Sequence, residues 1–85
     1  MYRIVFSRSA EKDLDKIPSA VVKKIGKSID TLATEPRPQG CKKLQASTEN
    51  FWRIRVGDYR IIYQIEVEIK IIDIRRIRHR KDVYK

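Results

Sequence analysis

The sequence contains a single cysteine and no long hydrophobic segment. Cys41 cannot form a disulfide within the chain, which is typical of proteins of a reducing compartment. No apolar run approaches the roughly 18 residues that a membrane span needs. The apolar stretch 1–6 is too short for a signal peptide and is interrupted by Arg3. These absences predict a cytoplasmic protein that has no membrane partner.

The chain is short and contains no repeat, low-complexity tract or domain linker. Its 85 residues are enough for one domain, so we expect a single domain spanning 1–85. Hydrophobic residues make up 41% of the chain, which is enough to build one core. A domain of this size buries a smaller fraction of its surface than a larger one, so the expected stability is modest.

Basic residues are abundant, and arginine is concentrated in the second half of the chain. Twenty Lys and Arg residues against eleven Asp and Glu residues give a formal net charge of +9. Such a charge favours nucleic acid as a partner, although acidic proteins and anionic lipid also bind basic domains. Arginine supplies three of the ten basic residues in 1–50 and seven of the ten in 51–85. Since the guanidinium group matches phosphate bidentately, we expect phosphate contacts in 51–85.

The first half of the chain shows one strand pattern followed by two helical patterns. Residues 2–6 are rich in strand formers and predict a first strand. Either Ser7 or Ser9 is expected to cap a first helix, which Pro18 ends, and Ser19 is expected to cap a second. The apolar stripe of the first helix is Ala10, Leu14 and Ile17. The stripe of the second is Val22, Ile25, Ile29, Leu32 and Ala33.

A breaker-rich connection, 34–40, separates the helices from a region of β pattern. Alternation of apolar and polar residues predicts three strands, over 51–56, 59–65 and 69–75. Gly57 followed by Asp58 suits a type II′ hairpin between the first two. Residues 76–85 are too basic for a core and are expected to form a tail. The order β-α-α-β-β-β predicts an α+β fold with two N-terminal helices packed on one face of a small antiparallel sheet.

The hairpin turn fixes which residues share a face of the sheet. It pairs Arg55 with Arg60. The expected core face carries Trp52, Ile54, Val56, Tyr59, Ile61, Tyr63 and Ile65. The opposite face carries Arg53, Arg55, Arg60, Ile62 and Gln64. Opposed like charges destabilise a sheet, and such a conflict is typical of a functional site. A solvated polar face is the alternative, but three arginines without an acid favour anion binding.

The basic tail carries the remaining candidates for chemistry. Histidine titrates near neutral pH and suits proton transfer, and His79 is the only histidine in the chain. A histidine in a basic run is more often a solvated bystander. Tyr84 offers a stacking platform for an exposed base, or it simply anchors the tail to the domain. If the tail folds over the arginine face, these residues join the same site.

In these residues the sequence resembles the RelE/ParE toxin superfamily, and within it the RelE-like ribonucleases. The resemblance covers essentially the whole chain. The matching motifs are Trp52-Arg53-Ile54-Arg55, Gly57-Asp58-Tyr59-Arg60-Ile61-Ile62-Tyr63 and His79-Arg80-Lys81-Asp82-Val83-Tyr84. The resemblance implies a RelE-like fold and the toxin component of a type II toxin–antitoxin system. RelE-like toxins enter the A site of the ribosome and cut mRNA, with the 2′-OH of the RNA attacking the scissile phosphate.

The resemblance also assigns roles to individual residues. The basic residues of the family's second strand correspond to Arg53 and Arg55, and the arginine of its next strand to Arg60. Its C-terminal arginine corresponds to Arg80, with Arg78 as the alternative register. The expected catalytic set is therefore Arg55, Arg60, His79, Arg80 and Tyr84. The expected RNA-binding set is Lys42, Lys43, Arg53 and Arg78.

The chemistry expected of this set is charge stabilisation at a phosphate. Arginines brace the oxygens of a transferring phosphoryl group without a metal. The sequence shows no Asp, Glu and His cluster, so no metal or other cofactor is expected. Arginine is a poor general base, which leaves open the group that takes the 2′-OH proton. His79 is the first candidate, and Arg55 is the alternative as an electrostatic activator.

The expected partners are a small antitoxin, acidic or with an amphipathic helix, together with the ribosome and mRNA. Operator DNA is a further partner through the toxin–antitoxin complex. The main alternative is a ParE-like toxin, which inhibits DNA gyrase and lacks nuclease activity. A plain RNA-binding module and an inactive toxin are the remaining alternatives. Retention of Arg60, His79, Arg80 and Tyr84 favours the ribonuclease.

Overall fold

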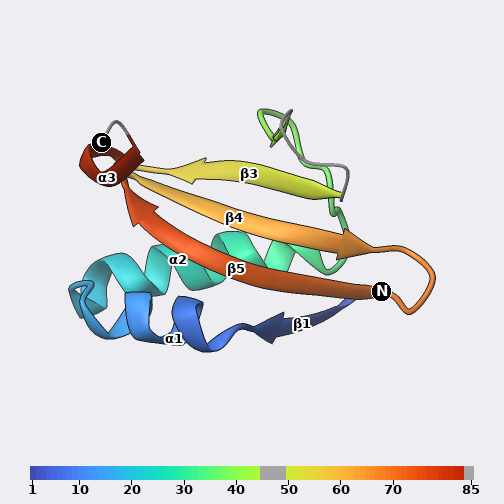
Figure 1. Ribbon diagram of the computed structural model, residues 1–85, viewed down its shortest axis with the longest axis horizontal. Helices are drawn as coiled ribbons and strands as arrows, with labels where there is room; N and C mark the ends of the chain where they lie inside the picture. The colour runs from blue at the N-terminus through green and yellow to red at the C-terminus, as the bar shows by residue number, and fades with distance from the viewer. Residues whose placement is uncertain (45–49, 84–85) are drawn as a thin grey trace.

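The first and last strands of the chain are neighbours in one sheet. A computed structural model describes residues 1–44 and 50–83, and its sheet has five strands in the order β1-β5-β4-β3-β2 (Figure 1). β1 and β5 are parallel, and the other neighbours are antiparallel. The strands are β1 (Arg3–Phe6), β2 (Lys42–Lys43), β3 (Phe51–Val56), β4 (Tyr59–Glu66) and β5 (Ile71–His79). The α+β fold is confirmed, but the sheet is mostly rather than wholly antiparallel, and the short β2 was not predicted.

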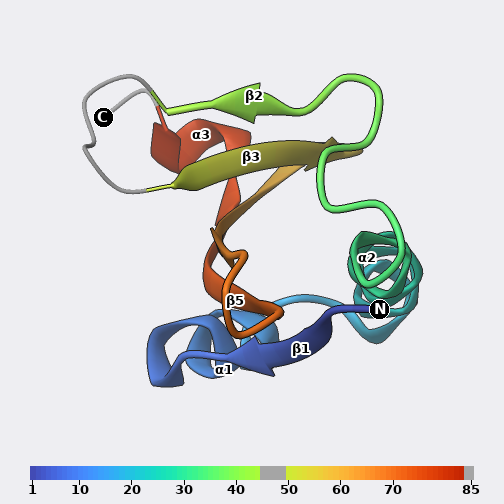
Figure 2. The same ribbon diagram turned by 90° about the vertical axis from the view of Figure 1, so that its right-hand side faces the viewer.

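Two helices cover one side of this sheet, and a short third helix ends the described chain. α1 (Arg8–Asp15) and α2 (Ser19–Leu32) lie beneath the three long strands in Figure 1. In Figure 2, α2 lies to the right of β5 and the C-terminal turn α3 (Arg80–Val83) lies above it. No helix in the described ranges is long and apolar enough to cross a membrane.

The helix starts follow from the residues that precede them. Ser7 caps α1, and its hydroxyl accepts the backbone N–H of Ala10 at 3.1 Å. The prediction that Ser19 caps α2 was wrong, because Ser19 is already its first helical residue. Pro18 takes the capping position, with φ −56° and ψ 142°, and its carbonyl accepts the N–H of Val22 at 3.0 Å. The fixed φ of proline prepares the chain for the helix without a side-chain cap.

The core lies between the helices and the sheet. Fully or nearly fully buried apolar residues are Ala10, Ile25, Ile29, Leu32, Ile54, Ile61, Tyr63, Ile65, Ile72, Ile74 and Ile77. The predicted helix stripes and sheet face supply most of this set, although Val21 rather than Val22 packs against it. Tyr63 directs its hydroxyl to the carbonyl of Pro36 at 2.7 Å, and burial raises the pKa of Tyr63. A buried phenol needs such a partner, so this bond fixes the 36–41 connection against the core.

The predicted hairpin register is confirmed. Arg55 pairs with Arg60, and Val56 pairs with Tyr59 across the turn. Gly57 has φ +58°, a conformation that side chains other than glycine rarely adopt. Asp58 is not at positive φ, which agrees with a type II′ rather than a type I′ turn. The register therefore brings the two arginines face to face at the end of the sheet.

The predicted basic tail was wrong, because β5 continues to His79. Ile77 is 3% exposed and pairs with Ile61, so the core extends past Arg75. The partners of Ile62 and Tyr63 are Arg76 and Ile74, which leaves Arg75 as an extra residue in a β-bulge. The bulge shifts the alternation of apolar and polar residues along β5 by one position. Because of this shift, the sequence pattern did not indicate that the strand continues.

Candidate functional site

Three arginines form one row across the three long strands of the sheet. Arg55 of β3 lies opposite Arg60 of β4, which in turn lies opposite Arg78 of β5. Directly opposed residues share a face. The adjacent row belongs to the core and consists of Ile54, Ile61 and Ile77. Since neighbouring residues of a strand point to opposite faces, the arginine row faces away from the core.

A hollow of about 240 Å³ lies on this face beside the row. Arg60 is 9% exposed at its base, whereas Arg55 is exposed at its rim. The residues that line the hollow are Gly40, Lys42, Arg53, Arg55 and Arg60. Lys42 reaches it because β2 pairs Lys42 with Arg53, and Gly40 turns the chain into β2 with φ +91°. The hollow is therefore built from two hairpin strands and an edge strand.

The electrostatics of this hollow favour an anion. Within the described ranges, the ion pairs are Arg75–Asp73, Arg76–Asp13 and Arg80–Asp58, so none of them neutralises Lys42, Arg53 or Arg55. Cations gathered in a concave surface attract phosphate more strongly than the same charges spread over a flat face. Across residues 1–44 and 50–83, no three His, Cys, Asp or Glu side chains cluster as metal ligands would. The chemistry available at this site is electrostatic stabilisation by guanidinium groups.

Of the predicted RNA-binding residues, Lys42, Arg53 and Arg78 lie on the arginine face, and Lys43 does not. Lys43 pairs with Trp52, whose side chain packs against the core, so the side chain of Lys43 shares that other face. Two consecutive lysines on a strand cannot serve one face.

Arg80 begins α3 and lies beyond the arginine row. Its backbone N–H donates to the carbonyl of Asp58 at 2.7 Å, and its Nη1 lies 4.0 Å from the Asp58 carboxylate. These contacts tie the C-terminal turn to the tip of the hairpin. The row position expected of a C-terminal arginine is instead filled by Arg78. The predicted Tyr84 lies outside the described residues.

His79 is not brought to the arginine row. It pairs with Tyr59, and the two rings meet edge to face with centroids 5.1 Å apart. Its Nδ1 accepts the backbone N–H of Lys81 at 3.2 Å. His79 follows Arg78 directly in the strand, so the two side chains point to opposite faces. The register therefore separates the side chain of His79 from Arg55 and Arg60, although His79 and Arg78 both border one hollow at the edge of β5.

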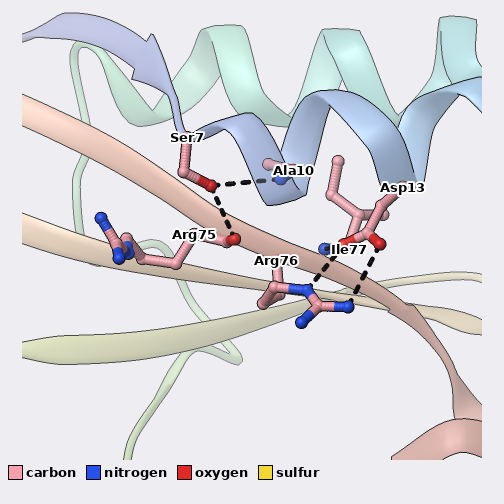
Figure 3. Close-up of polar contacts among 6 residues, drawn as sticks. All are labelled: Ser7, Ala10, Asp13, Arg75, Arg76 and Ile77. Carbon is pink, nitrogen blue, oxygen red and sulfur yellow. Dashed lines mark hydrogen bonds and ion pairs between the residues drawn. The ribbon is translucent and has the colours of Figure 1, made fainter.

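Asp13 is a structurally important residue that was not singled out in the sequence. Its carboxylate accepts Nε of Arg76 at 2.9 Å and the backbone N–H of Ile77 at 2.9 Å (Figure 3). The sequence feature that could have indicated this role is the position of Asp13 in the apolar stripe of α1. Asp13 falls at helical spacing between Ala10 and Ile17, and a carboxylate in a buried stripe needs a partner.

Comparison with known proteins connects this geometry to one family. A family model described as the ParE toxin of the type II toxin–antitoxin system parDE matches residues 4–84. The chain is 33% identical to putative toxin RelE1 of Methanocaldococcus jannaschii, with 99% of this chain and 96% of that protein covered. It is 31% identical to toxin RelG of Mycobacterium tuberculosis, with 99% and 97% covered.

Solved structures agree with the sequence comparisons. A chain of the archaeal RelE–RelB complex from Pyrococcus horikoshii superposes with a TM-score of 0.82 at 30% identity, covering 93% of this chain and 94% of that one. Similarity therefore extends over the whole fold, including the strands that carry the arginine row. The chain belongs to the ParE toxin family of type II toxin–antitoxin systems, and it is a RelE-like toxin.

Proposed function

We propose that this toxin is a ribosome-dependent endoribonuclease that cuts mRNA in the A site. The row of Arg55, Arg60 and Arg78 beside a basic hollow carries this proposal. Aligned guanidinium groups of this kind suit a phosphodiester whose oxygens gain charge during cleavage. The similarity to RelE toxins supports the same activity class.

In the proposed reaction the RNA supplies its own nucleophile. The 2′-oxygen attacks the scissile phosphorus, a new O2′–P bond forms, and the P–O5′ bond breaks. The 2′-hydroxyl gives its proton to solvent water, and the departing 5′-oxygen takes a proton from solvent water. Most of the catalysis in such a transfer is positioning and charge stabilisation, which a rigid sheet can supply.

We assign the central position to Arg60, because it is the most buried arginine of the row and lies between the other two strands. Its side chain is held by its surroundings, so little conformational entropy is lost when it binds phosphate. Arg55 and Arg78 flank it and contact the same phosphate or its neighbour. Lys42 and Arg53 extend the contact along the RNA backbone.

Arg78 takes the role first expected of Arg80, since Arg78 lies in the row whereas Arg80 lies at the hairpin tip. His79 faces the other side of the sheet, so we assign it no proton transfer in this hollow. Arg55, exposed at the rim, activates the 2′-hydroxyl electrostatically. Tyr84 keeps its proposed role in stacking on the nucleotide beside the cut.

The proposed partners follow from the reaction and from the relatives. mRNA in the A site requires the ribosome, and both occur in the cytoplasm. The archaeal relative forms a complex with RelB, and a comparable antitoxin with an amphipathic helix and acidic residues would suit the basic face of this toxin. The toxin–antitoxin complex would in turn bind operator DNA.

Primer extension on a reporter mRNA after brief induction tests the activity. Wild type should give discrete cuts within translated regions, and an Arg55→Ala, Arg60→Ala variant should give none. Lys24→Ala, on the exposed side of α2, is the matched control and should cut like wild type. Growth arrest with intact mRNA would contradict the nuclease. Loss of supercoiling by purified gyrase on addition of the toxin would then identify the ParE-like alternative. This alternative is retained because the matching family model is that of the ParE toxin.

A further inference from the structure

A second hollow lies along the free edge of β5, away from the arginine hollow. β1 pairs with β5 only as far as Ile74, and the end of α1 lies beside the remaining part of the strand. The hollow between them measures about 250 Å³. Its polar and aromatic lining consists of Asp13, Lys16, Tyr59, Arg76, Arg78 and His79.

The charge of this second hollow is positive. Among the described residues, Asp13 is the only acidic one that lines it, and the Asp13 carboxylate is already engaged by Arg76 and the backbone N–H of Ile77. Lys16 and Arg78 take part in none of the ion pairs of the described chain. Lys16 and Arg78 thus border a concave surface whose one carboxylate is already engaged, which favours an anionic ligand.

The same hollow has an aromatic wall. The rings of Tyr59 and His79 meet at 88° with centroids 5.1 Å apart, and both residues are partly exposed. The contact between His79 Nδ1 and the backbone N–H of Lys81 fixes the imidazole plane. A fixed ring beside cations is the combination that holds a base and its phosphate in single-stranded nucleic acid.

We propose that this hollow is a second RNA subsite, in which Lys16 and Arg78 bind one phosphate and the Tyr59–His79 pair stacks on one base. This inference rests on the proposed function, because it extends the path of the same RNA. Arg78 joins the two sites, since it borders this hollow and lies opposite Arg60 of the first. The RNA therefore passes around the end of β5 from the arginine row to the aromatic wall.

An acidic segment of a protein would satisfy the two cations but would leave the aromatic wall without a role. A nucleotide uses both parts, because every base has a π-face and every linkage has a charge. RNA is therefore the ligand class that the lining favours. Binding of an acidic protein segment instead of RNA is the alternative that the test distinguishes.

Binding of a fluorescent 2′-O-methyl RNA of about ten nucleotides tests the phosphate contact, since this RNA lacks the nucleophilic hydroxyl. Lys16→Ala should weaken binding about fivefold at low salt and should lower the slope of log K against log salt by about 0.7, the value for one lost contact on a single strand. Lys24→Ala removes the same charge from an exposed site on α2 and should change neither quantity. Equal behaviour of the two variants would overturn the subsite, as would a Lys16→Ala effect on antitoxin binding alone.

Substitution of His79 tests the aromatic contact. His79→Ala should weaken RNA binding about tenfold, in line with the loss of one stacked base, and His79→Phe should restore most of it. Failure of phenylalanine to restore binding would overturn the stacking role. These outcomes are separate from those of the proposed function. If the wild-type protein cuts mRNA and the Lys16 and His79 variants bind RNA as the wild type does, only the subsite is contradicted. If mRNA stays intact with the wild-type protein, the nuclease activity itself is contradicted.

Discussion

The carboxylate of Asp13 accepts the backbone N–H of Ile77 at 2.9 Å and joins α1 to the terminal half of β5. The same carboxylate forms an ion pair with Arg76 (Figure 3). β1 no longer accompanies β5 at this point, so Asp13 supplies the acceptor that another strand would otherwise provide. A helix side chain thus completes the edge of the sheet next to Arg78.

Replacement of Asp13 by alanine should destabilise the fold by about 2–3 kcal/mol, because it leaves a partly buried amide and Arg76 without their acceptor. Asp13→Asn retains an acceptor for Ile77 and should cost less. Urea denaturation followed by circular dichroism measures both. Asp15→Ala removes an exposed carboxylate from the same helix and should lie within about 0.5 kcal/mol of wild type. Equal effects at the two positions would contradict the role of Asp13.

Ser7→Ala should cost about 1 kcal/mol of stability through loss of the helix cap. The Ser7 hydroxyl accepts the N–H of Ala10 and donates to the carbonyl of Arg75 at 2.9 Å, so it also ties α1 to β5 (Figure 3). Ser9 lies within α1 on the exposed side, and Ser9→Ala should be neutral or slightly stabilising. Thermal unfolding of the two variants separates the residues, and a larger loss at Ser9 would refute the assigned cap.

Gly57→Ala should destabilise the protein by about 1–2 kcal/mol, because φ at this position is +58° and a side chain there is strained. Gly26→Ala is the matched substitution within α2, where an added Cβ meets nothing within 4 Å. This second change should stabilise the protein by about 0.5–1 kcal/mol. The opposite signs, measured by the same denaturation assay, distinguish turn strain from a general effect of alanine.

In the proposed reaction, Arg78→Ala should lower the rate of mRNA cleavage on ribosomes about 100-fold or more, since it removes one cation from the row proposed to bind the phosphate. Arg80→Ala should lower the rate far less, because Arg80 faces Asp58 at the hairpin tip. Single-turnover cleavage on programmed ribosomes measures the two rates directly. A larger loss for Arg80 would restore the register first expected from the sequence and would place α3 at the phosphate during the reaction.

Local patterns predicted the hairpin and its arginines well. The pairing of Arg55 with Arg60 depends only on the two-residue turn and on alternation along the strands, and both features are contained within a few residues. The helices could also be predicted from their apolar stripes. In α2, for example, Ile25, Ile29 and Leu32 recur at helical spacing.

Features that depend on distant partners were not predictable from the sequence pattern. The end of β5 read as a tail because the bulge at Arg75 separates the buried Ile74 and Ile77 by three positions instead of two. The charge of Arg76 is tolerated at this edge because Asp13, 63 residues earlier, pairs with it. Arg78 and His79 lie on opposite faces because β5 continues through both residues. Since this continuation was not predicted, the division of the site into two hollows could not be predicted either.

The parallel pairing of β1 with β5 has a consequence for how the toxin is made. Ser7 and Arg75, which meet at this junction, are 68 residues apart. Contacts between such distant positions form late in folding, because the intervening chain must be synthesised and closed first. The nascent chain therefore cannot complete its sheet, or align Arg78 with Arg60, until almost all of it has emerged. A fragment that ends before β5 therefore has neither the completed sheet nor the arginine row.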